Sequence, residues 1–406
     1  MRILLSAALF AIVTICNAQY KNDNVAFKTV YLEDLCKTIQ NNSDFLILDV
    51  RSEGEYDDTS SSSNLNIGHL KNAKHIDVRE LPNRLNELAG YREKPVFVYC
   101  SHSQRSRRAS KMLSDSGFLK VFNINAGLTG FHLFQNDLSD CSEVIMETNT
   151  PYTLLSPQQV SENISMKKSY FILDIRNDSV FNGSSTDERK KAMGRLSGAI
   201  NIPFTKLESS LSAIPTNQPV LIVDDFGNES PKAALLLLGK GYKDANVLFN
   251  GMDAMAQYQA DPKNKSSIKW IPGSNYHLLP GEEFDKLMRS GKPVVALDVR
   301  TRDEFNNQSK NSWQNIGNIK DAINIPYVDL QQQASSLAFS KNTPVVIYAF
   351  SNSSEAYESA RILSSNGYKN VNVLLGGLFN LRWKAANLKG REHLKEWAVN
   401  IPVENQ

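Results

Sequence analysis

The strongest constraint on the fold is a threefold internal repeat. An apolar run that ends in the pattern Asp-X-Arg occurs at 45–51, 171–176 and 294–300, and its aspartates lie 125 and then 124 residues apart. A second shared segment begins with a glycine in each copy, at Gly68, Gly194 and Gly317. A repeat of this length predicts three copies of one structural unit rather than one large domain.

Each unit alternates short apolar runs with helical stretches. The runs are rich in Val, Ile and Leu, which is typical of parallel strands buried on both faces. Their alternation with helices predicts an α/β fold for each unit. Proline and glycine interrupt the pattern near 149–153 and within 261–274. These breaks predict domains over 25–145, 151–262 and 274–395.

The amino terminus has the pattern of a targeting segment. An apolar run from Ile3 to Ile15 follows Met1-Arg2 and precedes the small residue Ala18. The run is short for a membrane span, which needs about 20 residues. We therefore expect a signal peptide over 1–18, cleaved near Ala18, and a secreted or periplasmic protein. A lipid anchor at Cys16 is disfavoured because Ile15 is not the small residue that such processing favours.

Composition excludes some classes of partner. The formal net charge is only +2 and no long basic run occurs, so we expect no nucleic-acid partner. The six histidines show no ligand spacing with the cysteines. No nucleotide-binding loop is present, and the sequence therefore predicts neither a metal nor another cofactor.

Cys100 is the residue with the clearest chemical potential. It follows the apolar run 96–99 and precedes a short loop and a helical pattern. At the carboxyl end of a buried strand, loop amides and the next helix's dipole favour a thiolate. The predicted substrate-binding loop comprises Ser101, His102, Ser103, Gln104, Arg105 and Ser106. We expect Arg105 to bind an oxyanion donor. For His102 a positioning or exposed role is favoured, and the alternative is a hydrogen bond to the donor or proton transfer.

The other repeated residues have predicted roles as well. Asp49 and Arg51 recur in every unit, including those without the cysteine, and this pattern favours a supporting, structural role. Asp224 and Glu229 replace the cysteine and the arginine in the second unit, and Ala349 and Ser354 do so in the third. We interpret these as degenerate sites. Arg107 and Arg108 are expected on the solvent-exposed helix surface.

Three cysteines remain after the signal segment, namely Cys36, Cys100 and Cys141. An odd number leaves at least one free thiol if all pairing is intramolecular. Cys36 and Cys141 flank the first unit and are candidates to pair. The favoured alternative makes Cys36 a core residue of the helix around Leu32 and Leu35. In both cases Cys100 is expected to stay reactive.

The chain resembles the rhodanese family. The matching elements are Leu48-Asp49-Val50-Arg51, Gly68-His69-Leu70, and Cys100 to Ser106 followed by a helix. The resemblance implies three tandem rhodanese-like domains, each a mostly parallel five-stranded sheet with helices on both faces. It also implies sulfur transfer through a persulfide on Cys100. Single-domain members usually carry glycine where this chain has Ser103.

The leading hypothesis is an exported sulfurtransferase that moves sulfane sulfur from thiosulfate, or a related anionic donor, to a thiol or cyanide. Alternatives are a non-catalytic binding or scaffold protein and a persulfide carrier that uses Cys100 with Cys36 or Cys141. A phosphatase or arsenate reductase is disfavoured, because four residues separate Cys100 from Arg105 and such phosphatases use five. The units without a cysteine are candidates for contact with a protein partner, and no membrane span is predicted.

Overall fold

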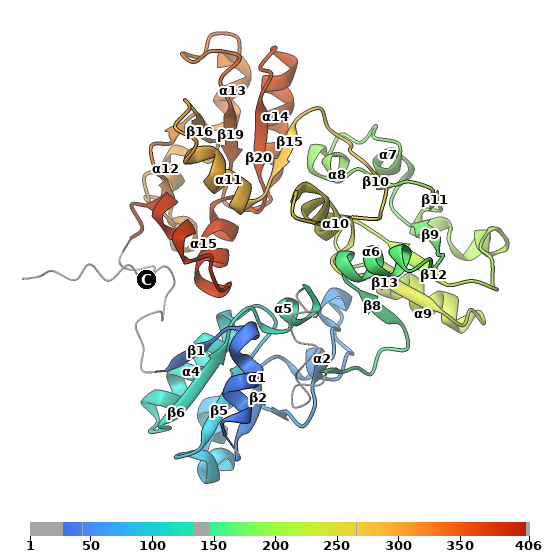
Figure 1. The fold of residues 1–406 in the computed structure, drawn as a ribbon, viewed down its shortest axis with the longest axis vertical. Coiled ribbons are helices and arrows are strands. Elements are labelled where there is room, and N and C mark those ends of the chain that lie inside the picture. The colour runs from blue at the N-terminus through green and yellow to red at the C-terminus, as the bar shows by residue number, and fades with distance from the viewer. Residues whose placement is uncertain (1–26, 43, 134–145, 265, 403–406) are drawn as a thin grey trace, which may run out of the picture.

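The computed structural model describes residues 27–42, 44–133, 146–264 and 266–402. The chain forms three lobes, here called domains 1, 2 and 3, which lie around a common centre (Figure 1). The helices α5 (Gly127–Leu133), α10 (Gly251–Ala260) and α15 (Gly377–Asn387) face that centre, one from each domain. The repeat seen in the sequence is therefore also a repeat in space.

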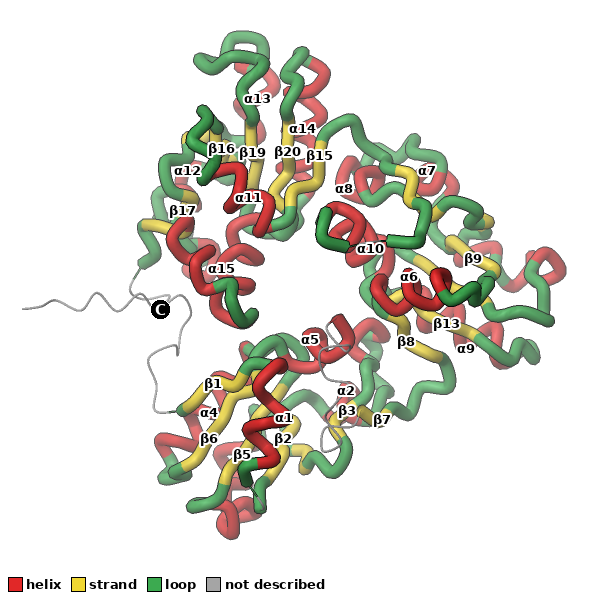
Figure 2. The backbone as a smooth tube through the Cα atoms, viewed as in Figure 1, coloured by secondary structure: helices red, strands yellow, loops and turns green. Residues whose placement is uncertain are grey.

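Each domain contains a five-stranded parallel sheet with the same strand topology (Figure 2). In domain 1 the strand order is β1 (Lys28–Val30), β6 (Lys120–Ile124), β5 (Pro95–Tyr99), β2 (Leu46–Asp49) and β4 (Lys74–His75). In domain 2 it is β8 (Thr153–Leu155), β13 (Ala245–Leu248), β12 (Val220–Val223), β9 (Phe171–Asp174) and β11 (Ile200–Asn201). In domain 3 it is β15 (His277–Leu279), β20 (Val371–Leu374), β19 (Val345–Tyr348), β16 (Val295–Asp298) and β18 (Ile323–Asn324).

Helices cover both faces of each sheet. Domain 1 has α1 (Leu32–Gln40), α2 (Glu53–Tyr56), α3 (Leu81–Arg84) and α4 (Gln104–Asp115) besides α5. Domain 2 has α6 (Pro157–Ser165), α7 (Asp178–Phe181), α8 (Glu188–Ala192) and α9 (Ser230–Gly239) besides α10. Domain 3 has α11 (Gly281–Met288), α12 (Arg302–Phe305), α13 (Tyr327–Gln333) and α14 (Ser354–Ser365) besides α15.

The core explains why the strands read as continuous apolar runs. Along β5, Phe97 packs in a cluster with Leu35 and Leu128 from α1 and α5. Its neighbour Val98 points to the opposite face and packs in a second cluster with Leu113 from α4. Alternate side chains of a strand point to opposite faces, so both faces need apolar residues. The predicted α/β fold is confirmed.

A short antiparallel pair closes each domain. β3 (His69–Leu70) pairs with β7 (Met146–Glu147), β10 (Arg195–Leu196) with β14 (Trp270–Ile271), and β17 (Asn318–Ile319) with β21 (Ala398–Val399). The glycine that begins the shared segment permits this pairing. A Cβ on Gly68 would lie 2.4 Å from the carbonyl oxygen of Glu147, and the φ of Gly68 is +77°.

The closing strands lie beyond the domain ends predicted at 145, 262 and 395. A two-residue strand has no periodicity that a sequence pattern can reveal. No described helix is long and apolar enough to span a membrane. The signal peptide predicted over 1–18 lies outside the described residues.

Candidate active site

Cys100 immediately follows β5, at the carboxyl end of the first sheet. Its side chain is buried, and it is a free cysteine. Its carbonyl oxygen accepts a hydrogen bond from the amide of Leu128 at 3.0 Å, and that of Ser101 accepts one from Thr129 at 3.0 Å. These two bonds fasten the start of the loop to α5, so the cysteine has a defined position.

Hydrogen bonds of the same kind identify the equivalent residues in the other domains. The amide of Met252 donates to the carbonyl of Asp224 at 2.8 Å, and that of Leu378 donates to the carbonyl of Ala349 at 3.1 Å. Each accepting carbonyl belongs to the residue that follows the third strand of its sheet, β5, β12 or β19. Each donating amide lies in the first turn of the helix that faces the common centre, α5, α10 or α15. Cys100, Asp224 and Ala349 therefore occupy one position in three copies of the fold.

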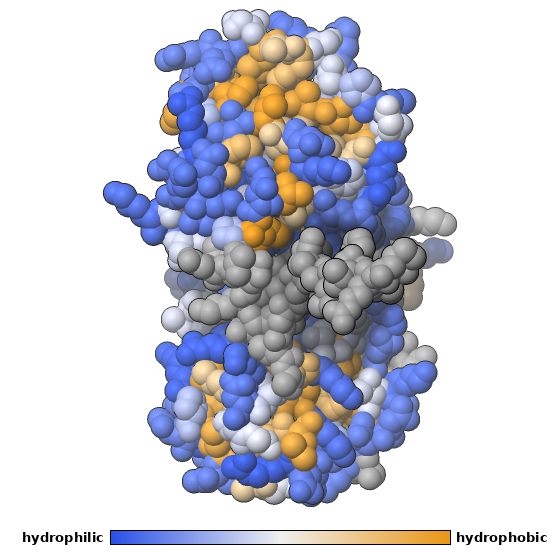
Figure 3. Space-filling view, turned by 90° about the vertical axis from the view of Figure 1, so that its left-hand side faces the viewer, coloured by the Kyte–Doolittle hydropathy of each residue, from blue (hydrophilic) through white to orange (hydrophobic). Residues whose placement is uncertain are grey.

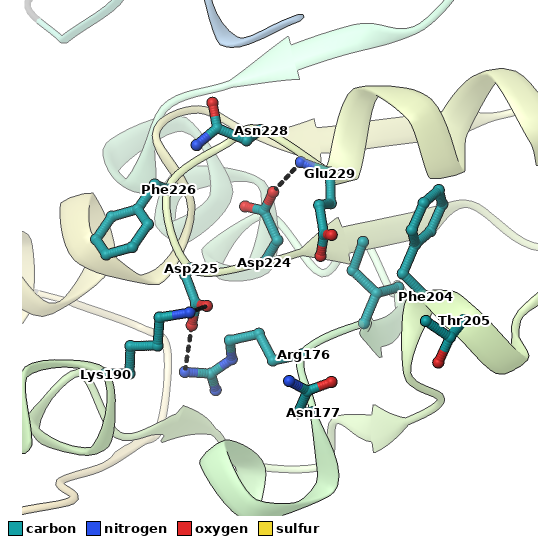
Figure 4. Close-up of a pocket in the computed structure, with 11 residues that line it drawn as sticks. Arg176, Asn177, Lys190, Phe204, Thr205, Asp224, Asp225, Phe226, Asn228 and Glu229 are labelled. Carbon is teal, nitrogen blue, oxygen red and sulfur yellow. Dashed lines mark hydrogen bonds and ion pairs between the residues drawn. The ribbon is translucent and has the colours of Figure 1, made fainter. Parts of the chain in front are cut away.

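In domain 2 the side chain at this position accepts hydrogen bonds from the loop that follows it. The carboxylate of Asp224 accepts hydrogen bonds from the amides of Gly227 at 2.6 Å, Glu229 at 2.6 Å and Ser230 at 2.9 Å. Figure 4 shows this carboxylate inside the turn of the loop. Burial raises the pKa of Asp224, and the three amides oppose this by stabilising the charged form. In this loop the amides converge on an anion.

The segment after Cys100 matches that after Asp224 in total length up to the end of the helix, although α4 begins at Gln104 and α9 only at Ser230. Leu113 in α4 and Leu237 in α9 each accept a C-terminal hydrogen bond at 3.1 Å, from Phe118 and Tyr242. Both leucines lie 13 residues after the cysteine position. Ser103 has a φ of +77° where Gly227 has +81°. The amides that bind Asp224 thus have equivalents in domain 1, and they belong to Ser103, Arg105 and Ser106.

Ser103 occupies a backbone conformation that favours glycine. A residue with a Cβ loses roughly 1–2 kcal/mol in the left-handed region. The side chain of Ser103 is 1% exposed, and its Oγ has no hydrogen-bond partner among the described residues. The left-handed φ gives a physical reason for the glycine that single-domain members usually carry here. The loop of this chain keeps the conformation despite the serine.

Arg105 does not stand free in the site, contrary to the simplest expectation. Its guanidinium donates to both carboxylate oxygens of Glu55, at 2.5 and 2.7 Å, and to the Oγ of Ser101 at 2.9 Å. Glu55 is buried. Although burial alone would raise the pKa of Glu55, the bonds from Arg105 and Ser52 lower it to about 2. The Arg105 guanidinium therefore already has a carboxylate partner.

Glu55 is a site residue that the sequence analysis missed. A signal was present, because Ser52 and Glu55 have the Ser-X-X-Glu spacing of a capping box, and that box forms at α2. The box places Glu55 at the end of β2, next to the cysteine loop. The distance of 50 residues between Glu55 and Arg105 hid their pairing.

We expect Glu55→Gln to weaken domain 1 at neutral pH and to change its response to acid. The folded-state pKa of Glu55 is lowered to about 2, so its stabilisation is present above the unfolded value and disappears as pH falls toward 2. Loss of the charged hydrogen bonds should cost about 2 kcal/mol at pH 7. Hydrogen exchange of β2 and β5 amides between pH 3 and 7 measures this. The difference between wild type and variant should shrink on acidification, and a constant difference would contradict the assignment.

The remaining loop residues divide into exposed and buried ones. The exposed His102 ring lies 2.9 Å from the Oγ of Ser101 through Nδ1 and 3.1 Å from that of Thr129 through Nε2. Packing around the ring and the nearby Arg105 lower the pKa of His102. Gln104 is exposed at the start of α4. Ser106 is buried and donates to Asn123 at 2.7 Å, which ties α4 to β6.

Domain 3 lies directly against this loop. The indole of Trp383 in α15 donates to the carbonyl oxygen of His102 at 3.1 Å. Arg107 is buried, and it donates to the carbonyl of Ala386 at 3.2 Å and to Asn125 at 3.1 Å. The prediction that Arg107 faces solvent is wrong, because the helix face that would be exposed in an isolated domain is covered here. Arg108 is exposed as expected.

Asp49 and Arg51 form a buried ion pair, and Arg51 also binds the backbone at Gly68. The guanidinium binds both carboxylate oxygens at 2.8 to 3.1 Å and donates to the carbonyl of Gly68 at 2.7 Å. The same arrangement occurs at Arg176 with Gly194 and at Arg300 with Gly317. Its presence beside Asp224 and Ala349 supports the structural role predicted for this pair.

The degenerate loops differ from each other. In domain 2, Glu229 takes the place of Arg105, and Asp225 pairs with Lys190 at 2.9 Å at the edge of the pocket drawn in Figure 4. In domain 3, Leu363 accepts the C-terminal bond of α14 from Tyr368 at 3.1 Å. Leu363 lies 14 residues after Ala349, one more than in the other domains.

The residue of α14 that corresponds to Arg105 is therefore Glu355, and not Ser354 as predicted from spacing. The spacing from Cys100 to Arg105, applied from Ala349, leads to Ser354. The sequence pattern does not reveal where the extra residue lies. The helix register, set by the last turn of α14, removes the ambiguity.

Cys36 contacts the core of domain 1 from α1, and it is disulfide-bonded. The favoured interpretation of Cys36 as an ordinary core residue is thus incomplete. Cys141 lies outside the described residues. Cys100 is free in this structure and is therefore not the partner of Cys36.

Comparison with known proteins agrees with the geometry. The model of the rhodanese-like domain matches residues 32–133, 156–258 and 281–385, which together exceed half of the chain. A tRNA uridine(34) hydroxylase of Cytophaga hutchinsonii is 29% identical over 102 residues, which are 24% of this chain and 30% of that protein. The uncharacterized protein YqhL of Bacillus subtilis is 32% identical over 81 residues, which are 20% of this chain and 56% of that protein. The aligned region thus spans less than two thirds of either relative.

Two solved structures are also similar. The thiosulfate sulfurtransferase of Pseudomonas aeruginosa aligns with 86% of this chain and 66% of its own, at 17% identity and a TM-score of 0.24. The anaerobic ergothioneine biosynthesis enzyme of Chlorobium limicola aligns with 93% of this chain and 100% of its own, at 14% identity and a TM-score of 0.28. With three matched domains and the sheets described above, this chain belongs to the family of proteins with rhodanese-like domains.

Proposed function

We propose that the chain is an exported sulfurtransferase that carries sulfane sulfur on Cys100, with thiosulfate or a related anion as donor. The observation that carries this proposal is the Asp224 carboxylate, which three loop amides bind at 2.6 to 2.9 Å. We infer that the amides of Ser103, Arg105 and Ser106, which correspond by position, stabilise the negative charge of a thiolate and of a persulfide on Cys100.

The reaction divides into two displacements at sulfur. The Cys100 thiolate attacks the outer sulfur of thiosulfate, a new S–S bond forms, and the old S–S bond breaks. Sulfite leaves with that electron pair, and Cys100 becomes a persulfide. A thiol or cyanide then attacks the outer sulfur and regenerates the thiolate, so the second step needs no further oxidant.

Partners and location follow from the same proposal. A small anionic donor and a thiol acceptor are the substrates, and domains 2 and 3 are candidates for contact with a protein acceptor. The segment 1–18 is proposed to direct the chain out of the cytoplasm. Domain 3 also contacts the site, since Trp383 of α15 donates a hydrogen bond to the His102 carbonyl.

Intact-mass analysis before and after thiosulfate tests the proposal. We expect a gain of about 32 Da, one sulfur atom, on the Cys100 peptide, and its removal by cyanide. Cys100→Ser is the matched control and should show no gain. If thiosulfate, mercaptopyruvate and low-molecular-weight persulfides all leave the mass unchanged while iodoacetamide still alkylates Cys100, the scaffold hypothesis replaces this one.

A further inference from the structure

A cleft of about 350 Å³ lies in domain 3 at the place that corresponds to the cysteine site of domain 1. Ala349 lines it, and its walls include Trp313, Tyr327, Val328 and Phe350. Trp313 and Val328 are 61% and 76% exposed, so the cleft opens to solvent. The rings of Trp313 and Phe350 pack edge to face, with centroids 5.1 Å apart. In Figure 3 the uppermost lobe is domain 3, and apolar residues gather on its face among hydrophilic ones.

The residues of the cleft carry less positive charge than the corresponding residues of the cysteine site. The amide of Tyr327 donates to Val299 just as that of Val78 donates to Val50. Tyr327 thus corresponds to Val78, and the next residue, Val328, corresponds to Arg79. Glu355 stands where domain 1 has Arg105. The basic residues Arg79 and Arg105 of domain 1 are therefore replaced in domain 3, one by an apolar side chain and one by a carboxylate.

The carboxylates that line the cleft, those of Glu304 and Glu355, form no ion pair among the described residues, although Glu304 interacts electrostatically with the guanidinium of Arg300. Glu304 corresponds to Glu55, since each closes a capping box after the Asp-X-Arg motif. In domain 1 this glutamate is neutralised by Arg105, whereas Glu304 accepts only from the neutral groups of Thr301 and Gln314. Arg300 also lines the cleft, but Asp298 at 2.6 Å compensates its charge. The cleft therefore carries uncompensated negative charge.

We propose that this cleft binds an organic cation, an ammonium or guanidinium group on an apolar stem. The faces of aromatic rings attract such cations, and carboxylates at the rim add charge complementarity. Free amines and the lysine or arginine side chains of a peptide share this chemistry. The proposal does not depend on sulfur transfer at Cys100.

Titration of the full-length chain with benzylamine and with benzyl alcohol tests the charge requirement. The two probes have nearly the same size, but only benzylamine is charged at pH 7. We expect benzylamine to bind about tenfold more tightly, with a dissociation constant in about the millimolar range or below, by NMR and Trp fluorescence. Trp313→Phe assigns the fluorescence signal to the cleft. Equal affinity for the two probes would overturn the proposal.

Two variants that each remove one carboxylate from α14 distinguish the effect of charge in the cleft from the effect of the net charge of the protein. Glu355→Gln removes a carboxylate that lines the cleft, and we expect benzylamine binding to weaken about tenfold. Glu358→Gln lies on the same helix and removes a carboxylate paired with Arg361 at 3.1 Å. It should leave binding unchanged. Equal effects of the two variants would contradict a site in the cleft.

A peptide arm identifies the source of the cation. A short peptide with one lysine is compared with the same peptide with norleucine at that position. Tighter binding of the lysine peptide than of benzylamine supports a protein partner, and weaker binding supports a free amine. If neither benzylamine nor the lysine peptide binds at about 10 mM, the proposal is wrong.

Discussion

Asp49→Ala should lower the unfolding free energy of domain 1 by about 4 kcal/mol. Both members of the Asp49–Arg51 pair are fully buried. Removal of one partner from such a pair leaves an uncompensated charge in the interior, which typically costs about 3–5 kcal/mol. The loss should extend to the segment after Gly68, because Arg51 also holds the Gly68 carbonyl at 2.7 Å.

Hydrogen exchange at β2 and β5 measures this local stability, since a chain of three domains does not unfold in one step. The matched control is Asp44→Ala in the same domain, where Asp44 and Lys94 form an exposed pair at 2.6 Å. Exposed pairs contribute little. If Asp49→Ala were no more damaging than Asp44→Ala, the structural role of the motif would be rejected.

Gly127→Ala should slow sulfur loading of Cys100 about 100-fold, because a misplacement of about 1 Å can have that effect on a reacting group. A Cβ on Gly127 would lie 2.2 Å from the carbonyl oxygen of Cys100 and 2.8 Å from that of Ser101. Both atoms belong to backbone that cannot move independently of the cysteine loop. The loop must shift, and Cys100 then leaves the position that its hydrogen bond to Leu128 defines.

Gly117→Ala is the control for backbone strain alone. Gly117 also has a positive φ, +87°, but a Cβ there would meet only the Arg92 side chain at 3.4 Å. The rate of mass gain with thiosulfate measures the effect. Hydrogen exchange of 100–106 reports loop displacement even if thiosulfate is not the donor. Similar rates for the two variants would show that the Gly127 contact does not position Cys100.

Much of the fold could be predicted from sequence because its determinants are local. Strand side chains alternate between two buried faces, so the runs that contain Phe97 and Val98 read as continuous apolar segments. The Asp-X-Arg motif is likewise local, since Arg51 binds Asp49 two residues away. The position of Cys100 after such a run followed from the same pattern.

The contacts within the site could not be predicted from the sequence, because they depend on the tertiary structure. Arg105 meets Glu55 across 50 residues, and no spacing rule connects them. Arg107 was assigned to solvent because an isolated helix gives no sign that Ala386, 279 residues away, covers it. The extra residue of the third copy could be recognised only from the hydrogen bonds of Ala349 and Leu363, which define the two ends of the segment that contains it.

The sequence alone thus determined that the chain has three α/β units and a cysteine in only one of the three equivalent positions, because both are set by residues that are close along the chain. Tertiary structure decided what surrounds that cysteine. It placed Glu55 on Arg105 and Trp383 on the His102 carbonyl, and it turned the third copy of the site into an acidic, aromatic cleft. The physical reason is that ion pairs, hydrogen bonds and clefts form between groups that are near in space, whatever their separation in sequence.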